Sequence, residues 1–141
     1  MVRINLISPK KLADQHLIAE YDEILMLLGY VRKYPKLELE KISKNYVLGK
    51  GHILFFKNKL KYLQKRHELI RKEMKRRGFE TNKRVVLSEF SRELRRDWRP
   101  SIKDYGGIKE RLRWKIKNKP NYYRYYGKKK SVSYLLRLLK E

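Results

Sequence analysis

The residues best suited to chemistry lie in the first two dozen positions of this 141-residue chain. If a helix follows Pro9, then His16, Glu20 and Glu23 share one face, and His16 and Glu23 lie two turns apart on it. A carboxylate on such a face can stabilise a developing positive charge and move protons. The alternative is ordinary structure, with a solvated helix glutamate and a partly buried imidazole.

The main-chain amine of the chain terminus is a second reactive group. An α-amino group has a pKa of about 7.7–8.0, against about 10.4 for lysine, so roughly a third of it is neutral near pH 7.5. Such an amine is a ready nucleophile for Schiff-base chemistry at an electrophilic carbon. At Val2 it exists only after Met1 is removed, which a small second residue permits. Many chains without this role begin in the same way.

Charge is divided unevenly along the chain. The 38 Lys and Arg residues against 15 Asp and Glu residues leave a formal net charge of +23, which predicts a polyanionic partner. Residues 1–40 hold six basic and six acidic side chains, whereas residues 111–140 hold eleven basic residues and no acid. A neutral N-terminal segment on a basic body suits a reaction centre set into a nucleic-acid-binding surface.

Composition predicts one folded domain over residues 1–141. Apolar residues make up 41% of the chain, which argues against disorder, and the length suits a single core. The absence of cysteine excludes disulfides and thiolate metal sites. No apolar run approaches about 18 residues, and no signal-peptide core opens the chain. We therefore expect an intracellular protein without a membrane span.

Hydrophobic periodicity predicts an all-α fold of three main helices behind an extended arm at residues 1–6. Ser8-Pro9 has the residue types of a helix start, and Tyr34-Pro35 ends the first apolar stripe. Apolar residues at alternating spacings of three and four predict a long second helix over about 52–77. Gly78 is a natural left-handed stop for it. We expect the arm to be threaded near the first helix.

The remaining segments carry shorter signals. Residues 36–50 indicate a loop, residues 87–98 a short helix, and residues 107–118 the third main helix. No segment alternates convincingly with the period of a strand. A tyrosine-rich basic segment follows at 121–130. Residues 131–141 form a possible C-terminal extension that either packs on the body or holds a partner.

The run from Leu12 to Tyr21, with Arg3-Ile4-Asn5-Leu6 before it and Glu23 after it, resembles the start of the pyrimidine-dimer DNA glycosylase family, or phage-type endonuclease V. The resemblance implies a base-excision repair enzyme that is both a DNA glycosylase and an abasic-site lyase. It further implies a metal-independent reaction without a cofactor, on damaged double-stranded DNA, and we expect a monomer. Further segments that share the resemblance are Leu48 to Phe56, Lys59-Leu60, Lys75 to Phe79, Lys115-Ile116 and Pro120 to Lys128.

The resemblance implies roles for individual residues. The amine of Val2 would be the nucleophile, and Glu23 would stabilise an oxocarbenium-like state and move protons. Alternatives remain open: Gln15 could brace the helix together with Asp14, and the tyrosines of the 121–130 segment could stack on bases or close the core. The residues expected at the DNA are Arg3, Gln15, His16, Arg111, Lys115, Tyr122, Arg124 and Lys128.

Two departures from the family pattern leave the lesion open. Asp22 and Met26 stand where the family commonly has arginine or another basic residue, and a carboxylate at Asp22 repels phosphate. The same chemistry on another damaged base, or mainly on abasic sites, is therefore a second hypothesis. A third is a non-catalytic basic nucleic-acid-binding module. A fourth is a metal nuclease that uses Asp14, Glu20, Asp22 and Glu23.

Overall fold

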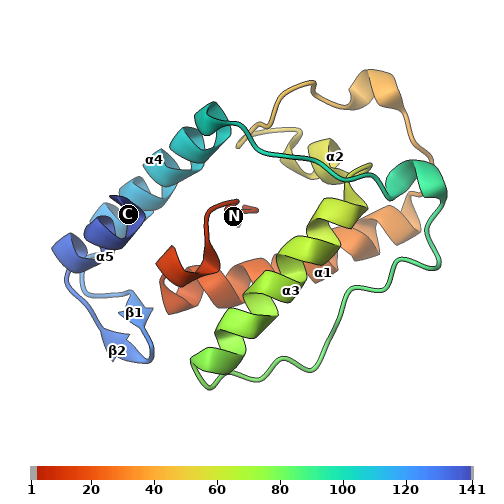
Figure 1. The fold of residues 1–141 in the computed structure, drawn as a ribbon. Helices are drawn as coiled ribbons and strands as arrows, with labels where there is room; N and C mark the ends of the chain where they lie inside the picture. The colour runs from red at the N-terminus through yellow and green to blue at the C-terminus, as the bar shows by residue number, and fades with distance from the viewer. Residues whose placement is uncertain (1–2, 141) are drawn as a thin grey trace.

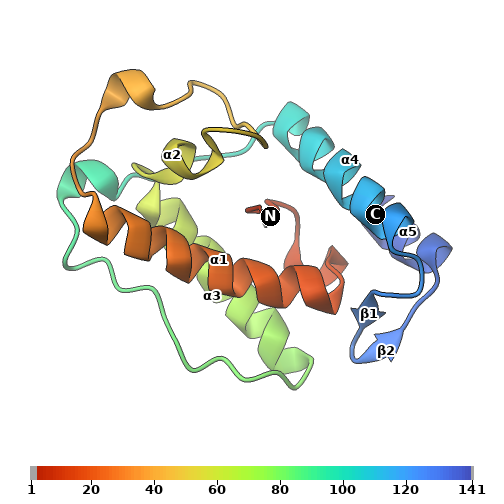
Figure 2. The ribbon, with the colours of Figure 1, turned by 180° about the vertical axis from the view of Figure 1, so that it is seen from behind.

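An extended arm lies in the middle of the molecule, with helices around it (Figure 1). The computed structural model describes residues 3–140. Ile4, Leu6 and Ile7 are buried and belong to the main hydrophobic core. The long helices α1 and α3 pack against each other on one side of the arm, and α4 lies on the other (Figures 1 and 2). The arm is thus threaded beside the first helix, as the sequence predicts.

The first helix, α1 (Asp14–Lys33), begins later than the sequence predicts. Ser8 precedes only a short 3-10 turn, η1 (Pro9–Lys11), and its hydroxyl makes no capping bond within the described chain. Leu12 and Ala13 then adopt an extended backbone, which places both side chains in the core. The predicted start at Pro9 is therefore wrong. The C-terminal end of α1 agrees with the prediction.

The predicted long helix over 52–77 is two helices, α2 (His52–Phe56) and α3 (Leu60–Arg76). At the break, Lys59 forms an isolated antiparallel bridge with Arg95. This main-chain pairing with a distant segment takes the place of one helical turn. The prediction of a continuous helix is wrong for this reason, because periodicity alone does not reveal a tertiary pairing partner.

The end of α3 is the predicted glycine stop. Gly78 has φ +84°, a left-handed conformation that glycine adopts without steric cost. Its N–H donates to Lys75 O at 3.0 Å, and the Phe79 N–H donates to Met74 O at 2.9 Å. Together these two bonds satisfy carbonyl groups of the last helical turn.

The helix α4 (Ile102–Asn118) starts five residues before the predicted position at 107. Ser101 accepts a hydrogen bond from the Asp104 N–H, and the Asp104 carboxylate accepts one from the Ser101 N–H. This capping box stabilises the N-terminal turn. Gly106-Gly107 lies inside the helix, where its low helix propensity hides the first turn from the sequence pattern.

The C-terminal segment contains a small hairpin and a fifth helix. Strands β1 (Arg124–Tyr125) and β2 (Lys128–Lys129) pair antiparallel, a feature that periodicity does not predict in two-residue strands. Helix α5 (Val132–Lys140) packs along α4 and buries Leu135 and Leu139. The extension at 131–141 therefore packs on the body over the residues that the structure describes.

The connecting segments are largely irregular. Residues 36–50 form the predicted loop, with a 3-10 turn η2 (Leu39–Lys41). The predicted short helix at 87–98 is wrong, because only the 3-10 turn η3 (Arg92–Leu94) forms there. Val85 and Leu87 are buried at a two-residue spacing, which reflects an extended path along the core. The described residues are mainly helical, but in five α-helices, of which α1, α3 and α4 are long.

Candidate active site and DNA interface

A buried arginine of α3 holds the arm against α1. Arg66 is 3% exposed and donates to both carboxylate oxygens of Glu20 at 2.6 and 3.0 Å. The same guanidinium donates to Leu6 O at 3.1 Å and to Ile7 O at 2.5 Å. Leu6 has φ +62°, a conformation that a leucine rarely adopts. Arg66 therefore fixes a strained turn of the arm, and the Glu20 carboxylate holds the Arg66 guanidinium in place.

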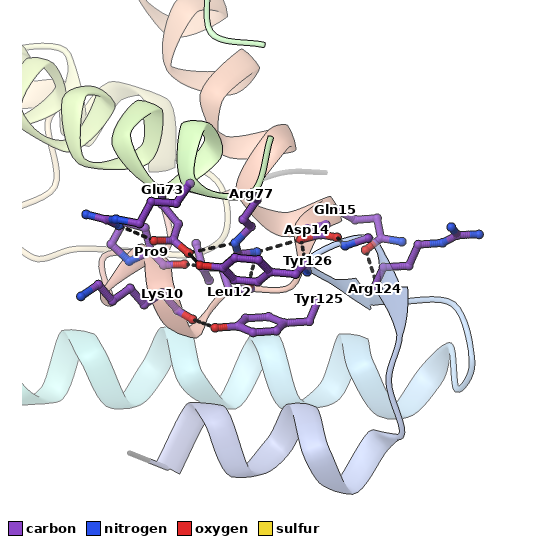
Figure 3. A network of polar contacts seen from close by, with 12 residues as sticks. Pro9, Lys10, Leu12, Asp14, Gln15, Glu73, Arg77, Arg124, Tyr125 and Tyr126 are labelled. Carbon is purple, nitrogen blue, oxygen red and sulfur yellow. Dashed lines mark hydrogen bonds and ion pairs between the residues drawn. The ribbon is translucent and has the colours of Figure 1, made fainter. Parts of the chain in front are cut away.

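A second buried arginine holds the chain between the arm and α1 (Figure 3). Arg77 donates to Pro9 O at 3.1 Å and to Leu12 O at 2.8 Å. Its charge is balanced by Asp14 and by Glu73, each at 2.9 Å. Two arginines thus supply the hydrogen bonds that this non-helical backbone cannot make with itself.

The tyrosine-rich hairpin is fastened to the same region (Figure 3). The Asp14 carboxylate accepts from the N–H groups of Tyr126 and Gly127 at 3.0 and 2.7 Å. The Tyr125 hydroxyl donates to Lys10 O at 2.8 Å. Asp14 is therefore shared between a buried arginine and the hairpin turn, which positions the hairpin relative to the start of α1.

Gln15 extends this connection by one residue. Its amide donates to Tyr122 O at 2.8 Å and accepts from the Arg124 N–H at 3.0 Å. Both contacts join the start of α1 to the hairpin. Gln15 therefore has the bracing role that the sequence left open as one of two alternatives. Contact of Gln15 with DNA stays a prediction.

The first residues of the arm are held by the segment at 46–52, which comprises the end of a loop and the start of α2. The Tyr46 hydroxyl donates to Ile4 O at 2.8 Å, and the Ile4 N–H donates to His52 Nε2 at 3.1 Å. Arg3 Nε donates to Leu48 O. Residues 48–56 share the family resemblance, but the resemblance alone did not predict that this segment holds the arm.

A cavity of about 210 Å³ opens between the arm, α1, α4 and the hairpin. Asn5 of the arm and Lys119 after α4 line it alongside predicted residues. The cavity brings together segments that lie about a hundred residues apart in the sequence. Six of the residues predicted to contact DNA line it: Arg3, Gln15, His16, Arg111, Lys115 and Tyr122.

Cations crowd around this cavity. Burial lowers the pKa of Arg3, and neighbouring Arg111 lowers it further, while Glu23 acts in the opposite direction. Burial likewise lowers the pKa of Lys115, again with contributions from Arg111 and Arg3. Positive groups gathered around a cavity create a site that favours an anion.

His16 is a neutral imidazole in this cavity. Burial lowers its pKa to about 4, with further lowering by Lys115 and Arg111. Its ring lies 4.6 Å from that of Tyr123, and its buried Nε2 has no hydrogen-bond partner among residues 3–140. A neutral ring with an open nitrogen can donate to or accept from a bound molecule.

The tyrosines of the 121–130 segment differ in burial, and stacking of the exposed ones on bases stays a prediction. Tyr123 is 6% exposed and belongs to the core. Tyr122 is 51% exposed at the cavity, and Tyr126 is 44% exposed. Arg124 and Lys128 do not line the cavity, but both are exposed on the hairpin beside it.

Glu23 lies half-buried on α1, close enough to Arg3 for the two charges to interact. Burial raises the pKa of its carboxyl group, and Arg3 partly offsets that rise. Asp22 and Met26 beside it are exposed, so both departures from the family pattern face solvent. Val2 lies outside the described residues.

The carboxylates named for a metal nuclease do not gather. Asp14 binds Arg77 and the hairpin, and Glu20 binds Arg66 in the interior. Among residues 3–140, no three histidine or acidic side chains lie close enough together to hold a metal ion. The placement of these donors gives no support to that hypothesis.

The sequence model of the pyrimidine dimer DNA glycosylase family matches residues 1–86. The chain belongs to this family. The match covers the arm, His16 and Glu23, and it ends before α4. Family membership implies a DNA glycosylase that binds DNA as its substrate. Arg111 and Lys115 of α4, which line the cavity, lie outside the matched segment. No helix among the described residues is long and apolar enough to cross a membrane.

Proposed function

We propose that this family member is a bifunctional DNA glycosylase and abasic-site lyase that acts as a monomer on pyrimidine dimers in double-stranded DNA inside the cell. The reaction would use the chain's own groups, without a metal or cofactor. The observation that carries the proposal is the cavity in which the arm, the cations of α4 and the neutral His16 meet. Glu23 lies within electrostatic reach of the arm residue Arg3.

The proposed reaction begins at the amine of Val2. Its nitrogen forms a bond to C1′ while the glycosidic C1′–N bond breaks, and the base leaves with that electron pair and takes up a proton. The amine loses a proton, the C1′–O4′ bond of the sugar ring breaks with O4′ taking up a proton, and an imine forms between C1′ and the amine. Glu23 removes the C2′ proton, and β-elimination breaks the C3′–O bond, so that the downstream strand leaves with a 5′ phosphate. Water then hydrolyses the imine and frees the amine. A raised pKa suits Glu23 to this proton transfer nearer to neutral pH.

The cations around the cavity would hold the DNA strand. Arg3, Arg111 and Lys115 would contact phosphates, while Tyr122 and His16 would contact the displaced nucleotide. Arg124 and Lys128 on the hairpin would extend this contact along the duplex. With about six phosphate contacts, the plot of log affinity against log salt concentration should have a slope near −5.

Borohydride trapping on duplex DNA with one abasic site tests the chemistry. Protein with a free Val2 amine should form a covalent adduct that maps to the N-terminal peptide, whereas a non-catalytic binding module forms none. Glu23→Gln should lower base release by at least about 100-fold while DNA binding is retained. The control is Glu80→Gln, which removes an exposed carboxylate from another region. Wild-type rates in the Glu23 variant would remove this residue from the mechanism.

The exposed carboxylate of Asp22 favours one alternative substrate. Because it lies beside Glu23 and repels phosphate, the same chemistry could act on another damaged base or mainly on abasic sites. Cleavage of matched duplexes with a pyrimidine dimer, an abasic site or no lesion separates these substrates. Equal cleavage of dimer-containing and intact DNA would exclude dimer repair.

A further inference from the structure

Both backbone groups of Ile4 are held by side chains from the segment at 46–52. The N–H donates to His52 Nε2 at 3.1 Å, and the carbonyl accepts from the Tyr46 hydroxyl at 2.8 Å. The rings of Tyr46 and His52 also contact each other edge to face, with centroids 5.5 Å apart. A backbone unit outside regular structure is thus fixed at both of its polar groups.

The same segment fixes one form of the His52 ring. Nδ1 lies 2.7 Å from Val47 O, and because a carbonyl only accepts, Nδ1 carries the proton. Nε2 is then free to accept from the Ile4 N–H, as the geometry requires. His52 is 3% exposed, and burial lowers its pKa to about 4, which agrees with a neutral ring.

This anchor would limit the reach of the proposed nucleophile, because Val2 precedes Ile4 by only two residues and two residues of chain span at most roughly 7 Å. Between them, Arg3 is tied to Leu48 O and interacts with Glu23. An arm released at Ile4 would sample many more positions and would reach C1′ less often.

We propose that His52 and Tyr46 are positioning residues that set the Val2 amine for attack, an inference that rests on the function proposed above. Neither residue would touch the substrate. Their hydrogen bonds to Ile4 would raise the fraction of molecules in which the amine is placed to react. This gives the histidine in Leu48-Gly49-Lys50-Gly51-His52 a role in the reaction.

The test separates the rate of the covalent step from the binding of DNA. Single-turnover borohydride trapping on an abasic duplex gives the rate, and binding to a duplex with a tetrahydrofuran abasic analogue gives the affinity. His52→Leu should lower the trapping rate at least about tenfold with unchanged affinity. His52→Gln, whose Oε1 can accept from the Ile4 N–H, should restore most of the rate. Tyr46→Phe, which removes a single hydroxyl, should give a smaller loss, and the exposed Tyr34→Phe should give none.

Three results would overturn the inference. Wild-type trapping rates in His52→Leu and Tyr46→Phe would show that the arm does not depend on these contacts. A parallel loss of rate and DNA affinity in His52→Leu that His52→Gln does not rescue would assign His52 a purely structural role. If wild-type protein with a free amine formed no adduct, the proposed function would fail as well. If wild-type protein forms the adduct and the His52 and Tyr46 variants form it at the same rate, only the positioning role fails and the proposed function stands.

Discussion

The interior arginines and the cations around the cavity differ in their charged neighbours. Arg66 and Arg77 are 3% and 9% exposed, and each binds a buried carboxylate at 2.9 Å or less. The cavity cations interact with one another, since Arg111 lowers the pKa of both Arg3 and Lys115. Each interior arginine thus faces a buried carboxylate, whereas several cations lie together around the cavity.

This difference indicates that the interior arginines stabilise the fold, whereas the cavity cations are placed to bind DNA. A balanced guanidinium in the interior can hold carbonyl groups of the arm without leaving an uncompensated buried charge. Accumulated cations at a cavity raise the electrostatic potential there, which an anionic ligand such as a DNA phosphate would relieve. Variants of the two groups should therefore differ in what they damage: stability in the first group, and DNA binding in the second.

The largest expected effect comes from breaking an interior pair. Arg66→Met leaves Glu20 buried without its partner, and we expect a loss of about 3–5 kcal/mol in the free energy of unfolding. Urea denaturation monitored by circular dichroism measures this loss. Adding Glu20→Leu should recover part of it, because the unpaired charge is removed. The exposed pair Arg32–Glu89 is the control, and Arg32→Met should cost less than about 1 kcal/mol. Equal losses in the two single variants would contradict the distinction between balanced interior charges and surface charges.

A smaller effect should appear as a dependence of stability on pH. The pKa values of His16 and His52 are lowered to about 4 in the folded protein, so both rings stay neutral where an unfolded histidine takes up a proton. Because the unfolded state binds more protons between pH 6.5 and 4, stability should fall as the pH falls through this range. At pH 5 each ring would contribute a loss of up to about 2 kcal/mol. Urea unfolding at pH 7 and pH 5 tests this, and His16→Gln should reduce the difference. A pH-independent free energy of unfolding would contradict the neutral assignment of these rings.

The sequence predicts those parts of the fold that depend on local pattern. The apolar stripe of α1, its end before Tyr34-Pro35 and the stop of α3 at Gly78 follow from periodicity and from the backbone preferences of proline and glycine. The break at Lys59 could not be predicted, because it depends on pairing with Arg95. The extended path after residue 80 likewise depends on the core that it covers.

The site divides in a similar way. Arg3 and His16, which family resemblance over a short segment pointed to, line the cavity, whereas the catalytic role of Glu23 stays a prediction. The structural roles of Arg66 and Arg77 could not, because a basic helix face is normally solvated. Their burial depends on carbonyls of the arm and of the segment before α1, about sixty residues earlier in the chain, which only the tertiary structure brings into reach.

The smallest effect on stability is expected for a variant of a cavity cation. Arg111→Gln removes the cation that lowers the pKa of Arg3 and Lys115, and its cost in the free energy of unfolding should be smaller than that of Arg66→Met. If Arg111 contacts one phosphate, DNA affinity should fall similarly for all sequences, and the salt slope should shrink by about one. Fluorescence anisotropy over a series of salt concentrations measures the slope. The control is Arg92→Gln, which removes the same charge at an exposed position on η3. Equal changes in slope for both variants would mean that net charge, rather than its accumulation at the cavity, sets the affinity for DNA.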